Sequence, residues 1–133
     1  MVSILDSIKE LHGINSADTS FDPALIMHIN GALMVMTQLG VGPLGGFSIT
    51  SKDDTWAQFL GNRTDLDLVK SDVYCRVRLV FDPPMNAFVV TAIEKQIIEY
   101  DWRIEAWHDP NMSNIPLYVP VPVINDDDDP FYD

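Results

Sequence analysis

The last fifth of the chain is rich in proline, and this feature most constrains the fold. Prolines stand at positions 110, 116, 120, 122 and 130. Because proline lacks a backbone donor and clashes with the preceding helical turn, residues 108–133 cannot form a helix. The same stretch is too rich in Leu, Tyr, Val and Ile for a solvated linker. We therefore expect a helical domain at residues 1–107 and an extended, acidic tail at residues 108–133.

Residues 1–107 have the apolar periodicity of helices, with apolar side chains recurring every three or four positions. The expected helices span residues 2–12, 22–39, 65–82 and 85–107, with a short additional helix that carries Trp56. The fold class predicted is all-α, a small bundle of four to five helices. The second helix is apolar nearly all round and should lie centrally.

Two helix starts and two apolar stripes can be specified further. Asp22 followed by Pro23 predicts a capped start, and Asp53 or Asp54 is expected to cap the short helix. In residues 65–82 the stripe is Leu66, Val69, Val73, Val77 and Val80. In residues 85–107 it is Val89, Ile93, Ile97, Tyr100, Ile104 and Trp107.

Residues 40–50 form a glycine-rich segment, GVGPLGGFSIT. Its first part has the letters of a dinucleotide fingerprint, but it follows a helix and opens none, so a nucleotide site is not expected. A loop that docks on a neighbouring subunit is the functional alternative. Phe47 and Ile49 alternate with polar residues, so this part of the loop could form a short strand or hairpin arm. Phe47 and Ile49 are candidates for contact between subunits.

The charge of the chain excludes several classes of function. The net charge of -12 argues against gripping nucleic acid through its phosphates. Half of that charge lies in residues 108–133, which hold neither Lys nor Arg. No apolar run is long enough to span a membrane, and the charged N-terminal helix does not resemble a signal peptide. The single cysteine, Cys75, fits a reducing compartment.

No group of residues predicts catalysis. His12, His28 and His108 lie at no metal-ligand spacing, and His28 is expected to be a satisfied buried or interface histidine. The aspartates at 126–129 lack the glycine and alternation of a calcium loop, so a solvated charge run is expected. Cys75 lies in mid-helix, where a reactive thiolate is not favoured. We expect no enzyme, no cofactor and no metal.

Arg76 and Arg78 lie in an otherwise apolar helix, two residues apart and therefore on different stripes. Either they form salt bridges with acidic residues of their own chain, or they contact an acidic face of a neighbouring subunit.

The tail has the pattern of a strand that pairs along one edge only. If residues 116–124 were extended, alternate side chains would share one face. That face carries Leu117, Val119, Val121 and Val123, with Tyr118 on the other face. The prolines of the segment stand at even positions, so the missing donors all lie along one edge. We predict that residues 116–124 add to a partner sheet. Phe131 and Tyr132 are either further anchors or a frayed end. The alternative is a polyproline-type tail that packs on its own body or remains disordered.

The longest stretch of recognisable pattern is residues 68–84, LVKSDVYCRVRLVFDPP. It is joined by residues 26–30, 38–43, 55–60, 88–89, 92–97 and 99–103. Together these segments resemble the head–tail connector, or adaptor, proteins of tailed bacteriophages. The likeness covers roughly residues 4–106, and the proline-rich acidic ending extends beyond it.

The resemblance implies a structural protein of the virion neck, assembled in the host cytoplasm. It implies a homo-oligomeric ring, a dodecamer, beneath the portal protein, with a tail-side stopper or tail terminator as its other neighbour. Genomic DNA would pass through the channel without specific binding, and acidic walls would keep that passage loose. The tail would reach onto the portal.

Two other classes of function remain to be weighed. The chain could be an acidic DNA mimic that inhibits a host nucleic-acid enzyme, but such mimics spread their carboxylates over the folded body, whereas here half of the excess is in the tail. An enzyme is disfavoured by the lack of a convergent polar site. Assembly into rings favours the connector, and stoichiometric inhibition of a nuclease favours the mimic.

Overall fold

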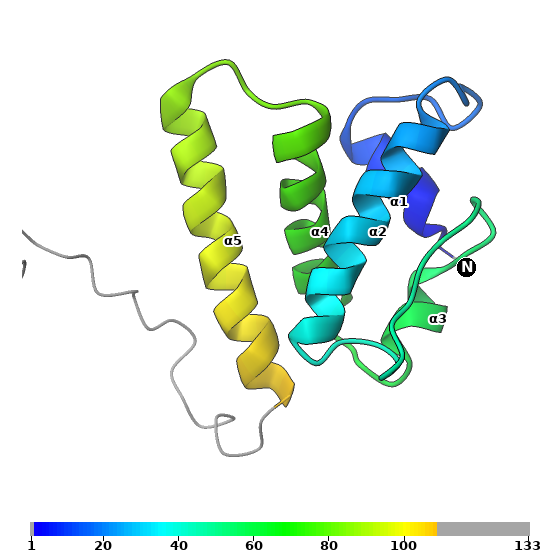
Figure 1. The fold of residues 1–133 in the computed structure, drawn as a ribbon, viewed down its shortest axis with the longest axis vertical. Helices are drawn as coiled ribbons and strands as arrows, with labels where there is room; N and C mark the ends of the chain where they lie inside the picture. Colours follow the sequence, from blue (N-terminus) through cyan, green and yellow to red (C-terminus); the bar gives the residue numbers. More distant parts are fainter. Residues whose placement is uncertain (1, 109–133) are drawn as a thin grey trace, which may run out of the picture.

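The computed structural model describes residues 2–108, and this part of the chain is all-α (Figure 1). The helices are α1 Ile4–Leu11, α2 Asp22–Gln38, α3 Trp56–Leu60, α4 Leu66–Phe81 and α5 Ala87–His108. The predicted small helical bundle is confirmed, with helix ends shifted by a few residues. Apart from His108, which ends α5, the expected tail lies outside the described residues.

The helices form a bundle in which α4 lies between α5 and α2 (Figure 1). α5 packs chiefly on α4, and α1 packs against α2 on the side of the bundle away from α5. α2 lies between α1 and α4, but it is not enclosed on all sides as expected, because Met27 and Met34 on its outer side are exposed. None of the helices in residues 2–108 is long and apolar enough to cross a membrane.

The sequence specified caps for two of the first three helices, and neither of the expected side chains caps its helix. Ser3 caps α1 by accepting a hydrogen bond from the Asp6 amide at 3.2 Å. α2 begins at Asp22 with Pro23 in its first turn, but the Asp22 side chain makes no capping bond. The Asp22 carboxylate pairs with the Lys9 ammonium instead, because an unpaired buried ammonium would cost more free energy than an uncapped helix end.

The cap of α3 is Thr55, so the expectation of Asp53 or Asp54 was wrong. Thr55 and Gln58 form a reciprocal capping box, in which each side chain accepts from the other residue's backbone N–H. Asp54 instead accepts hydrogen bonds from the amides of Thr50 and Ser51, at 2.7 and 3.2 Å. Its carboxylate therefore orders the loop that leads into α3.

Backbone contacts fasten this loop to the start of the chain. Ser3 and Thr55 form an isolated antiparallel bridge, and the Trp56 indole donates to the Ser7 hydroxyl at 2.7 Å. Trp56 and Ser7 are both buried, so the indole N–H needs this acceptor.

The glycine-rich segment is a loop, and no strand or hairpin arm forms in the described part of the chain. The Asn30 side chain of α2 makes two hydrogen bonds to the backbone of Ile49. It donates to the Ile49 carbonyl at 3.0 Å and accepts from the Ile49 amide at 2.7 Å. Val41 and Ile49 enter the core. Gly42 has a φ of +84°, and a Cβ there would lie 2.5 Å from the Phe59 ring. The loop is thus a packed part of the fold.

Candidate partner-binding surface

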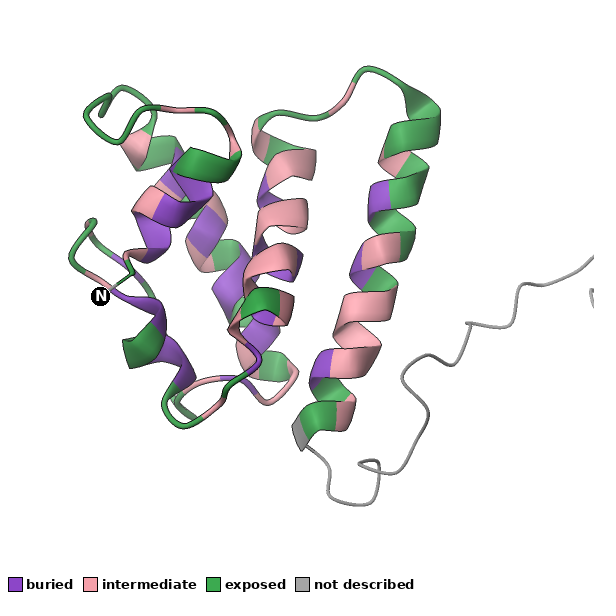
Figure 2. Cartoon of the chain, turned by 180° about the vertical axis from the view of Figure 1, so that it is seen from behind, coloured by how far each residue is buried: buried purple, intermediate pink, exposed green. Residues whose placement is uncertain are grey.

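The outer helix α5 buries only part of its predicted apolar stripe (Figure 2). Ile104 is completely buried, and Ile93 and Ile97 are nearly so. At the two ends of the helix, Val89 and Trp107 are exposed, and Phe88 is 86% exposed. On α4 the same holds for Val80, which was expected on the buried stripe but is 60% exposed. The bundle therefore leaves the Phe88 end of α5 without an apolar cover.

A groove lies between this end of α5 and helix α4. It has a volume of about 370 Å³. Its lining residues are Cys75, Phe88, Val89, Ala92, Ile93 and Gln96. All but Gln96 present apolar or weakly polar atoms. Such an open apolar groove on a small subunit is typical of a place where another chain segment packs.

Further along the α4–α5 contact, two carboxylates share one arginine. Arg76 Nε donates to Asp72 Oδ1 at 2.8 Å, and Arg76 also forms a short ion pair with Asp101 of α5. Asp72 is completely buried. The second oxygen of each carboxylate, Asp72 Oδ2 and Asp101 Oδ1, is buried, and apart from a proton shared between the two carboxyl groups it has no hydrogen-bond partner among the described residues. One positive charge therefore faces two carboxyl groups.

This imbalance changes the proton affinity of Asp72. Burial, the hydrogen bond to Asp101 and the negative charge of Asp101 raise the pKa of Asp72 to about 8, and Arg76 opposes the shift only in part. Two close carboxylates in a dry site cannot both ionise at low cost. Near neutral pH the pair holds one proton, so the polar link between α4 and α5 is a carboxyl–carboxylate pair bridged by Arg76.

The structure separates the two arginine candidates. Arg76 forms ion pairs with Asp72 and Asp101, as in the alternative that places its salt bridges within its own chain. Arg78 makes no ion pair with any residue of the described chain, and its positive charge acts on the nearby Cys75 thiol. Of the two, Arg78 is therefore the one whose charge is available to a partner, and its contact with an acidic neighbour remains a prediction.

The loop candidates lie mostly inside the subunit. Ile49 is 1% exposed, and Phe47 packs on Phe59 with ring centroids 5.3 Å apart. As contacts between subunits both remain predictions, and Ile49 would have to leave the core to make one. The tail candidates Leu117, Tyr118, Val119, Val121, Val123, Phe131 and Tyr132 lie outside the described residues.

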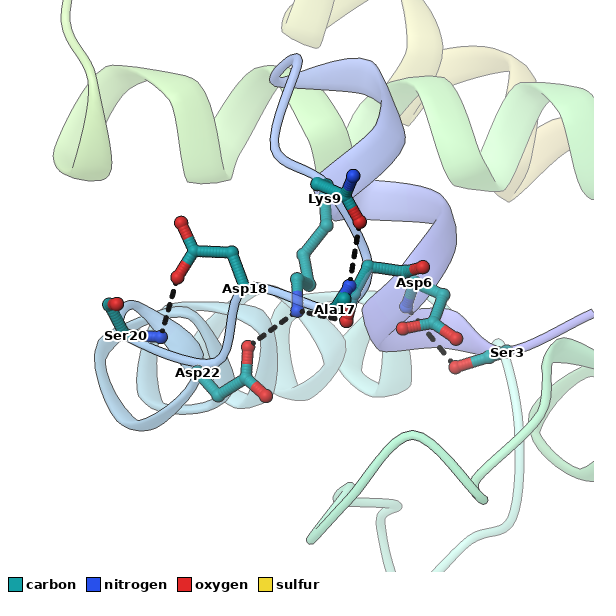
Figure 3. A network of polar contacts seen from close by, with 9 residues as sticks. Ser3, Asp6, Lys9, Ala17, Asp18, Ser20 and Asp22 are labelled. Atoms are coloured by element: carbon teal, nitrogen blue, oxygen red, sulfur yellow. Dashed lines mark hydrogen bonds and ion pairs between the residues drawn. The ribbon is translucent and has the colours of Figure 1, made fainter.

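A buried lysine was not foreseen from the sequence (Figure 3). Lys9 of α1 is 1% exposed, pairs with Asp22 of α2 at 2.9 Å and donates to the Ser16 carbonyl at 3.1 Å. The signal was available, because Lys9 stands four residues after the buried Leu5, on the apolar side of α1. The contact ties α1, the following loop and the start of α2 together.

The remaining polar candidates do not converge. His12 contacts the Ile8 carbonyl through Nδ1 and packs against the Tyr74 and Phe81 rings. His28 is half-buried beside Phe81, which agrees with a structural role. Burial raises the pKa of the Cys75 thiol, which disfavours the reactive thiolate. Within residues 2–108 no three His, Cys, Asp or Glu side chains are placed to hold a metal ion.

The described helical unit has an uncovered apolar groove, and its buried Lys9 and Asp72 are engaged in internal ion pairs, which suits a structural protein that acts by assembly. A family model described as phage connector protein matches residues 4–111. The chain therefore belongs to the phage connector protein family. No curated protein and no solved structure matched the chain. Membership gives a structural head–tail connector role, without catalysis, in contact with other proteins of the phage neck.

Proposed function

We propose that this connector forms a closed ring, a dodecamer, below the portal protein, where it joins the capsid to the tail and extends the DNA channel. The observation that carries the proposal is the uncovered Phe88 end of α5 in a chain whose match to the connector family covers residues 4–111. A subunit that exposes such a surface gains stability when a neighbour covers it. The tail-side partner in this arrangement is a stopper or tail terminator protein.

The acidic charge of the protein suits a channel that conducts DNA. With a net charge of -12, the subunits of a ring repel phosphate, so the DNA passes without being held. An inhibitor that mimics DNA would instead carry its excess charge on the folded body. In the described body, several acidic side chains are engaged in ion pairs with Lys9, Arg63, Arg76 and Arg103, which lowers the charge available for mimicry.

The tail is proposed to anchor the ring by adding residues 116–124 as a strand to a sheet of the portal. Its free donor edge carries the backbone N–H groups of residues 117, 119, 121 and 123, and the prolines occupy the other edge. Strand addition therefore depends on backbone donors at odd positions, and this dependence can be tested without changing the apolar character of the segment.

The test combines the full-length protein with the portal protein of the same phage and follows ring formation by sedimentation and electron microscopy. The double variant Val119→Pro with Val121→Pro removes two donors from the pairing edge and should abolish portal binding. The matched control, Ile124→Pro, adds a proline on the edge that already lacks donors and should still bind. Equal binding by the double variant would contradict strand addition. Failure of the unchanged protein to join the portal, together with tight inhibition of a host nuclease, would establish the mimic instead.

A further inference from the structure

We propose that in the free subunit residues 115–129 fold back along α5, so that their apolar part covers the α4–α5 groove of the same chain. The occupant is thus the protein's own tail, held there until a partner takes it. This intramolecular contact is a property of the free subunit and holds whether or not the tail later pairs with a portal sheet.

The groove offers side-chain contacts to such a segment. Phe88, Val89 and Ile93 form an apolar wall on α5, and Cys75 forms the opposite wall on α4. A proline-rich segment favours the polyproline II conformation, which docks on apolar and aromatic grooves through side chains and needs no sheet edge. With three residues per turn, Leu117, Pro120 and Val123 would share the ridge that faces the groove.

The length of chain between α5 and this segment matches the distance to the groove. α5 ends at His108, and the groove-lining residues Phe88 to Gln96 lie 12 to 20 positions earlier on the same helix. At 1.5 Å per residue this is about 18–30 Å. Residues 109–116 span about 25 Å in a polyproline II conformation. A tail that runs back along α5 therefore brings Leu117 to the level of the groove.

Charge at the rim of the groove complements the tail. Arg78 stands three residues after the lining residue Cys75, on the same side of α4, and has no ion pair within the described chain, although Asp72 also acts on Cys75. Lys95 is exposed and stands three residues after Ala92, on the same side of α5. Glu94 is the one acidic residue between Phe88 and Gln96, and Lys95 offsets it. The tail carries four consecutive aspartates at 126–129 and no basic residue.

Tethering favours the tail over other occupants. A segment joined to the same chain by a short linker has an effective concentration on the order of millimolar at its site. A second copy of the protein reaches that concentration only in a concentrated solution. Weak apolar and ionic contacts therefore suffice for the tail of the same chain.

Cys75 provides the readout, because it lines the groove and is the single cysteine of the protein. The rate at which a thiol reagent modifies Cys75 would be measured in the native full-length protein. It would be compared with a variant carrying Leu117→Ser, Val119→Ser, Val121→Ser and Val123→Ser, which keeps every charge. The variant should react about tenfold faster, equivalent to about 1.4 kcal/mol of docking free energy.

Two control variants show whether the protection of Cys75 comes from the docked segment itself. Phe131→Ser with Tyr132→Ser changes apolar residues beyond that segment and should leave the rate unchanged. The Val119→Pro, Val121→Pro variant keeps a polyproline conformation, so it should stay protected even while it loses portal binding. This variant distinguishes a failure of groove docking from a failure of the proposed connector function. Circular dichroism would confirm that the helices of all variants are intact.

The outcomes are decisive in both directions. Slow modification of the unchanged protein, independent of concentration over about a 100-fold dilution, supports docking within one chain. Equal rates in the unchanged protein and the serine variant would overturn the proposal. Protection that disappears on dilution would also overturn it, because the groove would then be covered by a neighbouring copy.

Discussion

At the scale of single residues, the polar link between α4 and α5 depends on a proton. Asp72 is completely buried beside Asp101, and Arg76 supplies the only positive charge that contacts the two carboxyl groups within the described chain. On α2, the other helix packed on α4, Asp22 is engaged with Lys9, and His28 lies against Phe81. The protonation of Asp72 is therefore set by its burial together with Asp101 and Arg76.

This arrangement predicts that the free energy of unfolding falls as the pH rises from about 4 to about 8. In the unfolded chain an aspartate loses its proton near pH 4. In the folded protein Asp72 keeps its proton up to a pKa of about 8. Within that window the folded state binds more protons, so stability decreases with pH, by up to about 1.4 kcal/mol per pH unit. Urea denaturation at several pH values would measure the slope.

The Asp72→Asn variant should lose most of this slope, because an amide keeps the neutral form at every pH. Asp67→Asn, an exposed residue on the same helix, should retain the slope of the unchanged protein. A slope that is the same in all three proteins would show that Asp72 is ionised in the folded state at neutral pH.

Neither Asp72 nor Lys9 was identified as a buried charge from the sequence. Their helices and apolar neighbours were predicted correctly, and both residues lie beside apolar stripe positions. The residue that contacts each buried charge could not be predicted from the sequence, since Asp22 lies 13 residues after Lys9 and Asp101 lies 29 residues after Asp72. A charge is buried when a distant partner meets it, and only the packing of the helices decides that.

At the scale of elements, the glycine-rich loop shows how a local pattern can be ambiguous. Its sequence allowed a mobile loop or a hairpin arm. Asn30 of α2 and the Phe59 ring instead hold it in one conformation. The helices themselves were more predictable, because periodicity, Pro23 and the Asp82-Pro83-Pro84 stop act within the segment they define.

Three glycines of the loop should differ sharply when replaced by alanine. Gly42→Ala should destabilise the protein by about 3 kcal/mol, since it combines a positive φ with a Cβ that overlaps Phe59. Gly46→Ala has the positive φ, but its Cβ would meet only the Met34 methyl at an ordinary contact distance of 3.9 Å, and about 1 kcal/mol is expected. Gly45→Ala has neither and should change stability by less than about 0.5 kcal/mol. Thermal unfolding would rank them, and similar values for all three would mean that the loop is not packed.

At the scale of the whole molecule, burial is concentrated on one side of the bundle (Figure 2). The core joins α1, α2, α3 and α4, whereas α5 adds Ile104 as its completely buried residue. The lower end of α5 is also held by Arg63, which donates to the Ile104 carbonyl at 3.2 Å and pairs with Asp65. The Phe88 end has no comparable contact among the described residues.

Hydrogen exchange should report this asymmetry along α5. Amides near Phe88 to Ala92 should exchange about tenfold or more faster than those near Ile104, because fewer buried contacts oppose local opening. Peptide-resolved mass spectrometry would measure the difference in the free four-serine tail variant, in which the tail does not cover the groove. The docked tail of the unchanged protein should reduce the difference, and uniform protection along α5 in the serine variant would contradict the weakness of this end.

The sequence by itself determined the helices, their order and the resemblance to phage connectors that the family match supports. The division into a helical body and a proline-rich tail is a further prediction from composition. These features depend on periodicity, turn residues and composition, which act over short stretches of chain. The tertiary structure alone decided which charges are buried, how the glycine loop is held and where apolar surface remains uncovered. These features depend on contacts between segments far apart in sequence, such as Lys9 with Asp22 and Arg76 with Asp101, whose geometry exists only once the helices have packed.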